Sequence, residues 1–148
     1  MKYFTNNIGV FLLSTFASCG VASYCVAEVV VDKAWIKLAP PAATANAAYI
    51  QLTNLQLHAQ TIVGVSADCC AMAMLHQIQY EGDKVSMVHL DRLVIPPQSS
   101  VQLAPGGTHI MLMQAREKLL LDHRVIITLT FSDGHSQMIE LVVKRDTQ

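Results

Sequence analysis

The sequence predicts an all-β protein, either a β-sandwich or a Greek-key barrel, and three features of the chain support this. Short runs rich in β-branched and aromatic residues recur along it, which is the composition of strands. Clusters of Gly, Pro and Asp separate these runs where turns are expected. No long stretch shows helical periodicity. Many short strands at regular spacing are typical of sandwiches and barrels.

The N-terminal segment, residues 1–27, is predicted to be a secretory signal peptide. Lys2 supplies a positive charge, an apolar stretch covers residues 8–17, and small residues precede a cleavage site after Ala27. The apolar stretch is shorter than the roughly 20 residues that a membrane-spanning helix needs. Two alternatives remain open: a lipoprotein anchored at Cys19, whose lipobox would be imperfect, and a retained N-terminal anchor helix.

Residues 28–148 then form one domain, without an internal repeat or low-complexity tract. We expect strands at 29–31, 34–36, 48–52, 61–65, 72–76, 85–90, 93–95, 101–103, 109–113, 125–131 and 138–143. Turns are expected at 40–41, 81–83, 96–97, 105–107 and 132–134. The stretch 114–123 has room for one helical turn.

Composition excludes several classes of function. The formal net charge is −1 and there is no basic patch, which argues against a nucleic-acid partner. The chain beyond the leader has no apolar run long enough to span a membrane, so we expect a soluble monomer. It shows no nucleophile elbow, no Gly-rich phosphate loop and no carboxylate pair with a supporting motif. We therefore expect a protein that is not an enzyme.

The informative feature is a set of His and Met residues at alternating positions. In the segment 109–113, His109, Met111 and Met113 occupy one face of the predicted strand, while Ile110 and Leu112 occupy the other. His109 and Met111 can therefore reach the same ion.

A predicted hairpin around residues 81–83 carries the same pattern, with donors at Met72, Met74 and His76 before the turn and at Met87 and His89 after it. A loop at 81–82 or 80–83 places Met87 directly opposite His76. A loop at 82–83 instead places His89 opposite His76, with Met87 on the diagonal. All these residues share one face in either register.

The donor types favour copper in its reduced state. Thioether sulfur is soft and uncharged, binds Cu(I) well and offers little to Zn, Mg or Ca. Imidazole suits copper in both oxidation states. Methionine also cannot be lost to a disulfide in an oxidising compartment, as a thiolate ligand can.

The spacing resembles that of the periplasmic copper chaperone family PCuAC. His76 is followed by ten residues and Met87, then by twenty-one residues, His109, one residue and Met111, which matches the family pattern throughout. Further similarities lie at Ala34-Trp35, Pro40-Pro41, Ala48-Tyr49, Leu52-Thr53-Asn54, Pro105-Gly106-Gly107 and Leu129-Thr130-Phe131. They extend over nearly the whole chain beyond the leader.

The resemblance implies a cupredoxin-like or immunoglobulin-like Greek-key β-sandwich or barrel in the periplasm. It implies one Cu(I) per chain, held by His76, Met87, His109 and Met111. Met74 and Met113 are then flanking or core residues, and His89 is a candidate additional donor. The implied role is delivery of copper toward the binuclear site of cytochrome c oxidase subunit II, with a Sco-type thiol protein as a further candidate partner. The alternative is copper storage or detoxification at the same site.

The chain departs from the family pattern in two places. It lacks a His- and Met-rich C-terminal tail, so a second site for Cu(II) of that kind is not expected. It also has adjacent cysteines, Cys69 and Cys70, which cannot close a long loop. They are a strained vicinal disulfide, a free thiol pair or an accessory copper donor. No cysteine lies near His109, where a blue-copper electron carrier would need one.

Overall fold

The computed structural model describes residues 29–145, so the predicted signal peptide and the lipobox alternative at Cys19 lie outside the described residues. The described chain forms ten strands. They are β1 (Val29–Lys37), β2 (Ala45–Asn54), β3 (Gln60–Ala67), β4 (Cys70–Glu81), β5 (Lys84–His89), β6 (Leu93–Ile95), β7 (Ser99–Leu103), β8 (Thr108–Ala115), β9 (Arg124–Phe131) and β10 (Ser136–Lys144). The prediction of an all-β protein is confirmed.

Every strand expected from the sequence is present, and the first two runs join into the single strand β1. The helical turn considered for 114–123 is absent: β8 continues to Ala115, and a bend and a short turn follow. Gln114 and Asp122 adopt positive φ values of 54° and 64°, which interrupt any helix there. Within residues 29–145 no helix is long and apolar enough to cross a membrane.

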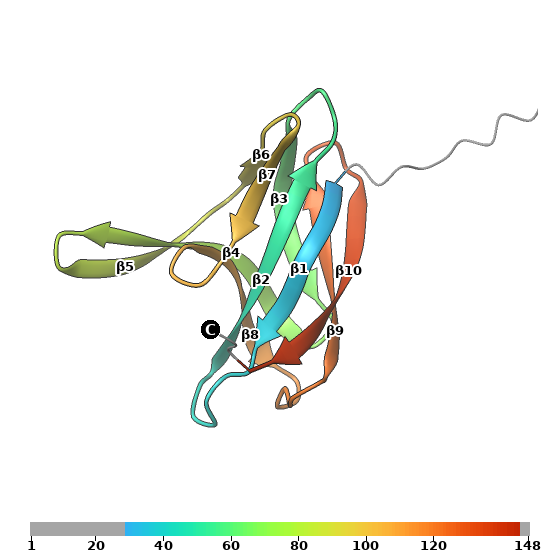
Figure 1. The fold of residues 1–148 in the computed structure, drawn as a ribbon. Helices are drawn as coiled ribbons and strands as arrows, with labels where there is room; N and C mark the ends of the chain where they lie inside the picture. The colour runs from blue at the N-terminus through green and yellow to red at the C-terminus, as the bar shows by residue number, and fades with distance from the viewer. Residues whose placement is uncertain (1–28, 146–148) are drawn as a thin grey trace, which may run out of the picture.

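The strands form one sheet in the order β5-β4-β8-β2-β1-β10-β9-β3-β6, and β7 also pairs with β2 (Figure 1). Most neighbours are antiparallel, whereas β1 and β10 run parallel. The strand β2 pairs with β8 through residues 45–48 and with β7 through residues 50–54. The first half of β2 therefore pairs with β8, which pairs with β4 on its other side, and the second half of β2 pairs with β7.

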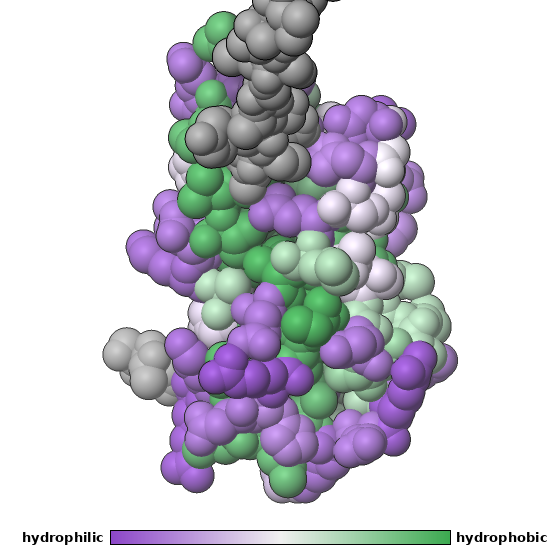
Figure 2. All heavy atoms as spheres, turned by 90° about the vertical axis from the view of Figure 1, so that its right-hand side faces the viewer, coloured by the Kyte–Doolittle hydropathy of each residue, from purple (hydrophilic) through white to green (hydrophobic). Residues whose placement is uncertain are grey.

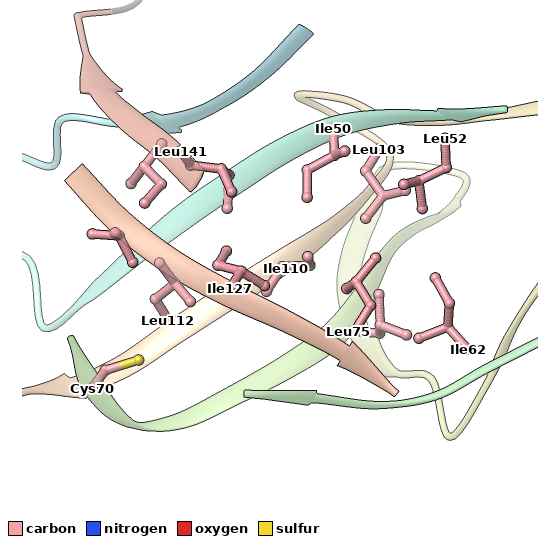
Figure 3. Packing of buried hydrophobic residues seen from close by; sticks show 14 of the residues in the cluster. Ile50, Leu52, Ile62, Cys70, Leu75, Leu103, Ile110, Leu112, Ile127 and Leu141 are labelled. Atoms are coloured by element: carbon pink, nitrogen blue, oxygen red, sulfur yellow. The ribbon is translucent and has the colours of Figure 1, made fainter. Parts of the chain in front are cut away.

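The sheet curls around one hydrophobic core. Side chains from β9 face those of β2 and β8 across this core, as Ile127 does near Ile110 (Figure 3). Ile110 and Leu112 are both fully buried, and Leu75 of β4 joins them. Because side chains alternate along a strand, the residues between them on β8 and β4 must lie on the opposite, outer face.

The β4–β5 hairpin extends away from the rest of the domain (Figure 1). Glu81 pairs with Lys84, so the loop consists of the two residues between them. Gly82, the first of these, has a φ of 60°, the positive value that a type II′ turn requires at this position. The side of the molecule opposite the hairpin carries hydrophilic residues interspersed with hydrophobic ones (Figure 2).

Candidate metal centre

The predicted ligands from the two halves of the chain meet across the β4–β8 ladder. His76 of β4 is the direct cross-strand partner of His109 of β8, and their ring centroids are 6.2 Å apart. On the other side of β4, His89 of β5 pairs with His76, with ring centroids 5.7 Å apart. The three imidazoles therefore form one row across three adjacent strands.

This pairing decides between the two hairpin registers. The loop is the Gly82-Asp83 form, and the residue opposite His76 is His89 rather than Met87. Met87 instead pairs with Ile78, one row closer to the hairpin tip, and so lies diagonally from His76. It remains on the same face as the histidines, as expected for either register.

The ring of His109 is held in a defined orientation. It is almost completely buried, with 5% of its surface exposed, and its Nδ1 lies 3.1 Å from the carbonyl oxygen of Gly107. Because a carbonyl only accepts, Nδ1 must carry the proton, and the lone pair is left on Nε2. The same carbonyl accepts a bond from the backbone N–H of Ile78 at 3.3 Å. The turn, β4 and the imidazole are therefore held together at one oxygen, an arrangement found around metal-binding histidines.

The ring of His76 is in a different environment. Its Nδ1 is buried and has no hydrogen-bond partner in the described part of the chain. Burial, followed by the proximity of His109 and His89, lowers the pKa of His76 below its ordinary value. A buried polar nitrogen without a partner is costly, and a neutral imidazole is the form that binds a metal. The residue therefore meets the chemical requirements of a ligand.

A hollow of about 200 Å³ brings together three of the four predicted ligands: Met87, His109 and Met111. It is completed by Ala45, Asn46, Ala47, Tyr49, Ile78 and Gly106. His76 is not among its lining residues and adjoins it through His109. Met87 is 50% exposed, so the hollow is open to solvent on the hairpin side.

The donors at this face are imidazoles and thioethers together. Among residues 29–145, no group of three or more His, Cys, Asp or Glu side chains is placed to hold a metal ion. Met74 pairs directly with Met111, and Met72 pairs with Met113, in the two rows that follow the His76–His109 pair. All four methionines are partly exposed, so Met74 and Met113 are flanking rather than core residues.

Sequence reasoning missed the support that surrounds His109. The ring of Tyr49, a buried residue of β2, lies 6.4 Å from the His109 ring, and Trp35 of β1 lies 4.9 Å from Tyr49. Tyr49, which packs against Trp35, and the carbonyl of Gly107 therefore both flank the His109 ring. Ala34-Trp35, Ala48-Tyr49 and the Gly-Gly turn were available as family similarities, but only strand pairing indicates what they contact.

Cys69 and Cys70 are free thiols at the start of β4. Cys70 is buried in the core, where its Sγ lies 3.4 Å from the carbonyl oxygen of Met72. Burial, and then the adjacent Cys70, raises the pKa of the Cys69 thiol to about 12. The six residues of extended strand from Cys70 to His76 span about 20 Å. The cysteine pair is therefore separate from the histidine row.

The described domain shares its fold with solved PCuAC domains. A copper-bound PCuAC domain from PmoF2 superposes with a TM-score of 0.68 at 20% identity, covering 83% of this chain and 97% of that domain. Cu(I)-bound DR1885 from Deinococcus radiodurans has a TM-score of 0.65 at 26% identity, covering 88% of this chain and 85% of that one.

The sequence itself places the chain in a family. Residues 29–143 match the family described as "Putative lipoprotein LpqE-like", and the chain belongs to this family. A relative from Leifsonia xyli subsp. xyli (strain CTCB07), "Putative lipoprotein Lxx21020", is 32% identical over 117 residues, which cover 78% of this chain and 69% of that protein. Together these comparisons confirm the expected resemblance, because the chain belongs to the LpqE-like family and has the fold of PCuAC domains and of DR1885.

Proposed function

We propose that this protein is an exported Cu(I)-binding metallochaperone that carries one Cu(I) ion and delivers it to another protein. The observation that carries the proposal is the direct cross-strand pairing of His76 with His109, beside the hollow lined by Met87 and Met111. Family membership and the copper-bound states of PmoF2 and DR1885 support the same conclusion.

The proposed ligands are His76, Met87, His109 and Met111. His109 contributes Nε2, because its Nδ1–H is donated to Gly107. Met111 follows on the same face of β8, and Met87 approaches from the edge strand β5. Two of the ligands thus belong to β8, and one each to β4 and β5. A ligand on the exposed hairpin lets an acceptor reach the ion by ligand exchange.

The same ligand set supports delivery rather than permanent retention. Two neutral imidazoles and two neutral thioethers do not compensate the positive charge of Cu(I). A site with anionic thiolates should therefore outcompete them. The binuclear copper site of cytochrome c oxidase subunit II, with two bridging cysteines, is the acceptor that we propose. A Sco-type thiol protein is a further candidate participant. Transfer would need only a transient contact of modest area.

The ligand assignment is tested by competition for Cu(I) with a chromophoric chelator. We expect one tightly held Cu(I) per chain and loss of this binding in a His109→Ala, Met111→Leu double variant. Met138→Leu is the control, because Met138 is an exposed methionine on β10. Retained binding in the double variant, or a tight stoichiometry far from one, would contradict the assignment.

Delivery is tested separately, by mixing the Cu(I)-loaded protein with reduced, copper-free subunit II domain. We expect the histidine ring resonances of the donor to return to their copper-free positions while those of the acceptor shift. If copper stays on the donor although the acceptor thiols are reduced, delivery to this target is rejected. Storage, or a different acceptor, is then the better explanation.

Export is the remaining part of the proposal. The predicted leader, residues 1–27, supports it, and the lipoprotein descriptions of the family and the relative favour Cys19 as a lipid attachment site more than the leader pattern did. Intact mass spectrometry of the protein from an exporting bacterium separates the alternatives. A chain starting at Glu28 indicates cleavage after Ala27, whereas a diacylated chain starting at Cys19 indicates a lipoprotein. An unprocessed chain would contradict both.

A further inference from the structure

Two further rows follow the histidine row along the β4–β8 ladder, and each consists of a cross-strand pair of methionines. Met74 pairs with Met111 and Met72 pairs with Met113, without a register shift between them. Directly paired residues have Cβ atoms about 5 Å apart, and successive rows on one face are about 7 Å apart. Methionine side chains are long and flexible enough to bring their sulfur atoms together over these distances. Only Met111 of these four belongs to the proposed primary site.

These methionines are not needed to fill the core. The core positions of β8 are occupied by Ile110 and Leu112, both fully buried. On β4 the corresponding inward residues are Ala73 and Leu75, which pack in or against the core. The four methionines alternate with these residues, lie on the outer face and remain partly exposed.

The neighbouring strand β2 presents small residues to the two methionine rows. The partners on β2 in the two methionine rows are Ala47, opposite Met111, and Ala45, opposite Met113. Both alanines line the 200 Å³ hollow that contains Met87, His109 and Met111. Ala45, the partner of Met113, thus extends the lining of the hollow to the level of the Met72–Met113 row, although Met111 is the one methionine of the two rows that lines it.

We propose that Met72, Met74 and Met113, together with the shared Met111, form a second Cu(I) site beside the first. Its donors are thioethers alone, which are soft, neutral ligands suited to Cu(I). Without an imidazole it holds the ion more weakly than the primary site does. Through Met111 the ion passes between the two sites by exchange of one ligand at a time. The inference rests on the proposed function in taking the His/Met site to bind the first equivalent.

The test is a titration of the protein, labelled with ¹³C in its methionine methyl groups, with Ag(I) as a redox-inert analogue of Cu(I). At the first equivalent we expect shifts of the Met87 and Met111 methyl resonances and of the His76 and His109 rings. At the second equivalent we expect the Met72, Met74 and Met113 methyl resonances to shift. To exclude any contribution of the Cys69 and Cys70 thiols, the titration is repeated in a Cys69→Ser, Cys70→Ala background.

A Met72→Leu, Met113→Leu variant, which conserves volume on a partly exposed face, should lose the second equivalent and keep the first. Met138→Leu is the matched control and should keep both. The inference is overturned if the Met72 and Met113 methyl resonances stay unchanged through two equivalents, or if the double variant still binds the second ion with wild-type affinity. The wild-type titration does not depend on the folding of any variant. Failure of the proposed function would instead appear at the first equivalent, as unshifted His76, His109 and Met87 signals.

Discussion

The two imidazoles of the proposed centre, His76 and His109, are each kept in a form that can bind a metal, but by different surroundings. His109 is buried beneath Tyr49, and its donated Nδ1–H fixes the tautomer that presents Nε2. His76 has no such hydrogen bond, and its neutral form is favoured by burial and by the neighbouring histidines. The proposed centre thus combines the His109 ring, which a hydrogen bond orients, with the His76 ring, whose Nδ1 has no hydrogen-bond partner among the described residues.

The first residue-scale prediction concerns pH. A proton competes with Cu(I) for each imidazole, so the apparent affinity should fall as the pH decreases. The pKa of His76 is lowered from the ordinary value of about 6.5, so its share of the loss should appear only below that pH. Chelator competition between about pH 7 and pH 5 measures the effect. An affinity that is flat over this range would show that His76 and His109 are not both ligands.

The second residue-scale prediction concerns the cysteines. Replacing Cys69 with Ser and Cys70 with Ala should leave the tight Cu(I) stoichiometry unchanged, because the pair lies about 20 Å along β4 from His76. Cys70→Ser should cost more stability than Cys70→Ala, since a hydroxyl would enter the core that holds Cys70. Urea unfolding and chelator competition measure the two effects. A large fall in tight Cu(I) affinity would make the cysteines ligands.

At the scale of single elements, β4 and β8 each perform two tasks through alternation. Their inward residues, such as Leu75 and Ile110, close the core, and their outward residues present the donors. The strand β5 differs, because it is an edge strand whose only partner within residues 29–145 is β4. The position of Met87 therefore depends on the hairpin turn.

This dependence gives a prediction for Gly82. Its φ of 60° is a left-handed conformation that disfavours a β-carbon, so Gly82→Ala should destabilise the turn by on the order of 1 kcal/mol. Apart from Gly82 and its two chain neighbours, no described residue has an atom within 4 Å of the added β-carbon, so backbone strain alone is tested. Cu(I) affinity should fall because β5 separates from β4 more often and takes Met87 with it. Gly82→Asn, which tolerates this conformation better, is the matched control. Equal affinity and melting temperature for the Gly82→Ala variant and the wild type would contradict the role of the turn.

At the scale of the whole molecule, the core and the proposed metal centre occupy opposite faces of the same strands. The domain should therefore fold without copper, unlike small domains that a structural metal holds together. Ile127→Ala, at a fully buried position, should lower the free energy of unfolding by about 2–5 kcal/mol. Met138→Ala, at a position 75% exposed, should change it by at most about 0.5 kcal/mol.

Urea unfolding of the copper-free protein measures both core variants, and chelator competition follows the site. We expect Ile127→Ala to keep one tight Cu(I) per chain at temperatures where it remains folded. Loss of copper binding by a fully folded Ile127→Ala protein would show that the core and the centre are coupled.

The sequence by itself determined the fold class, the strands and the residues that share a face. Alternation is a local property, so the segment 109–113 already separated His109 and Met111 from Ile110 and Leu112. The donor chemistry was equally local, because thioether and imidazole favour Cu(I) wherever they lie. The family spacing added which four donors belong together, and their assignment as ligands remains a proposal.

Only the tertiary structure decided which strands are neighbours and in what register. The turn sequence Glu81-Gly82-Asp83 accommodates two registers, and the paired positions select the one that places His89 opposite His76. The pairing of β4 with β8, the Met72–Met113 row and the contact of Tyr49 with His109 join residues far apart in the chain. The physical reason is that strand pairing is set by how the buried faces pack around a common core, which no local pattern encodes.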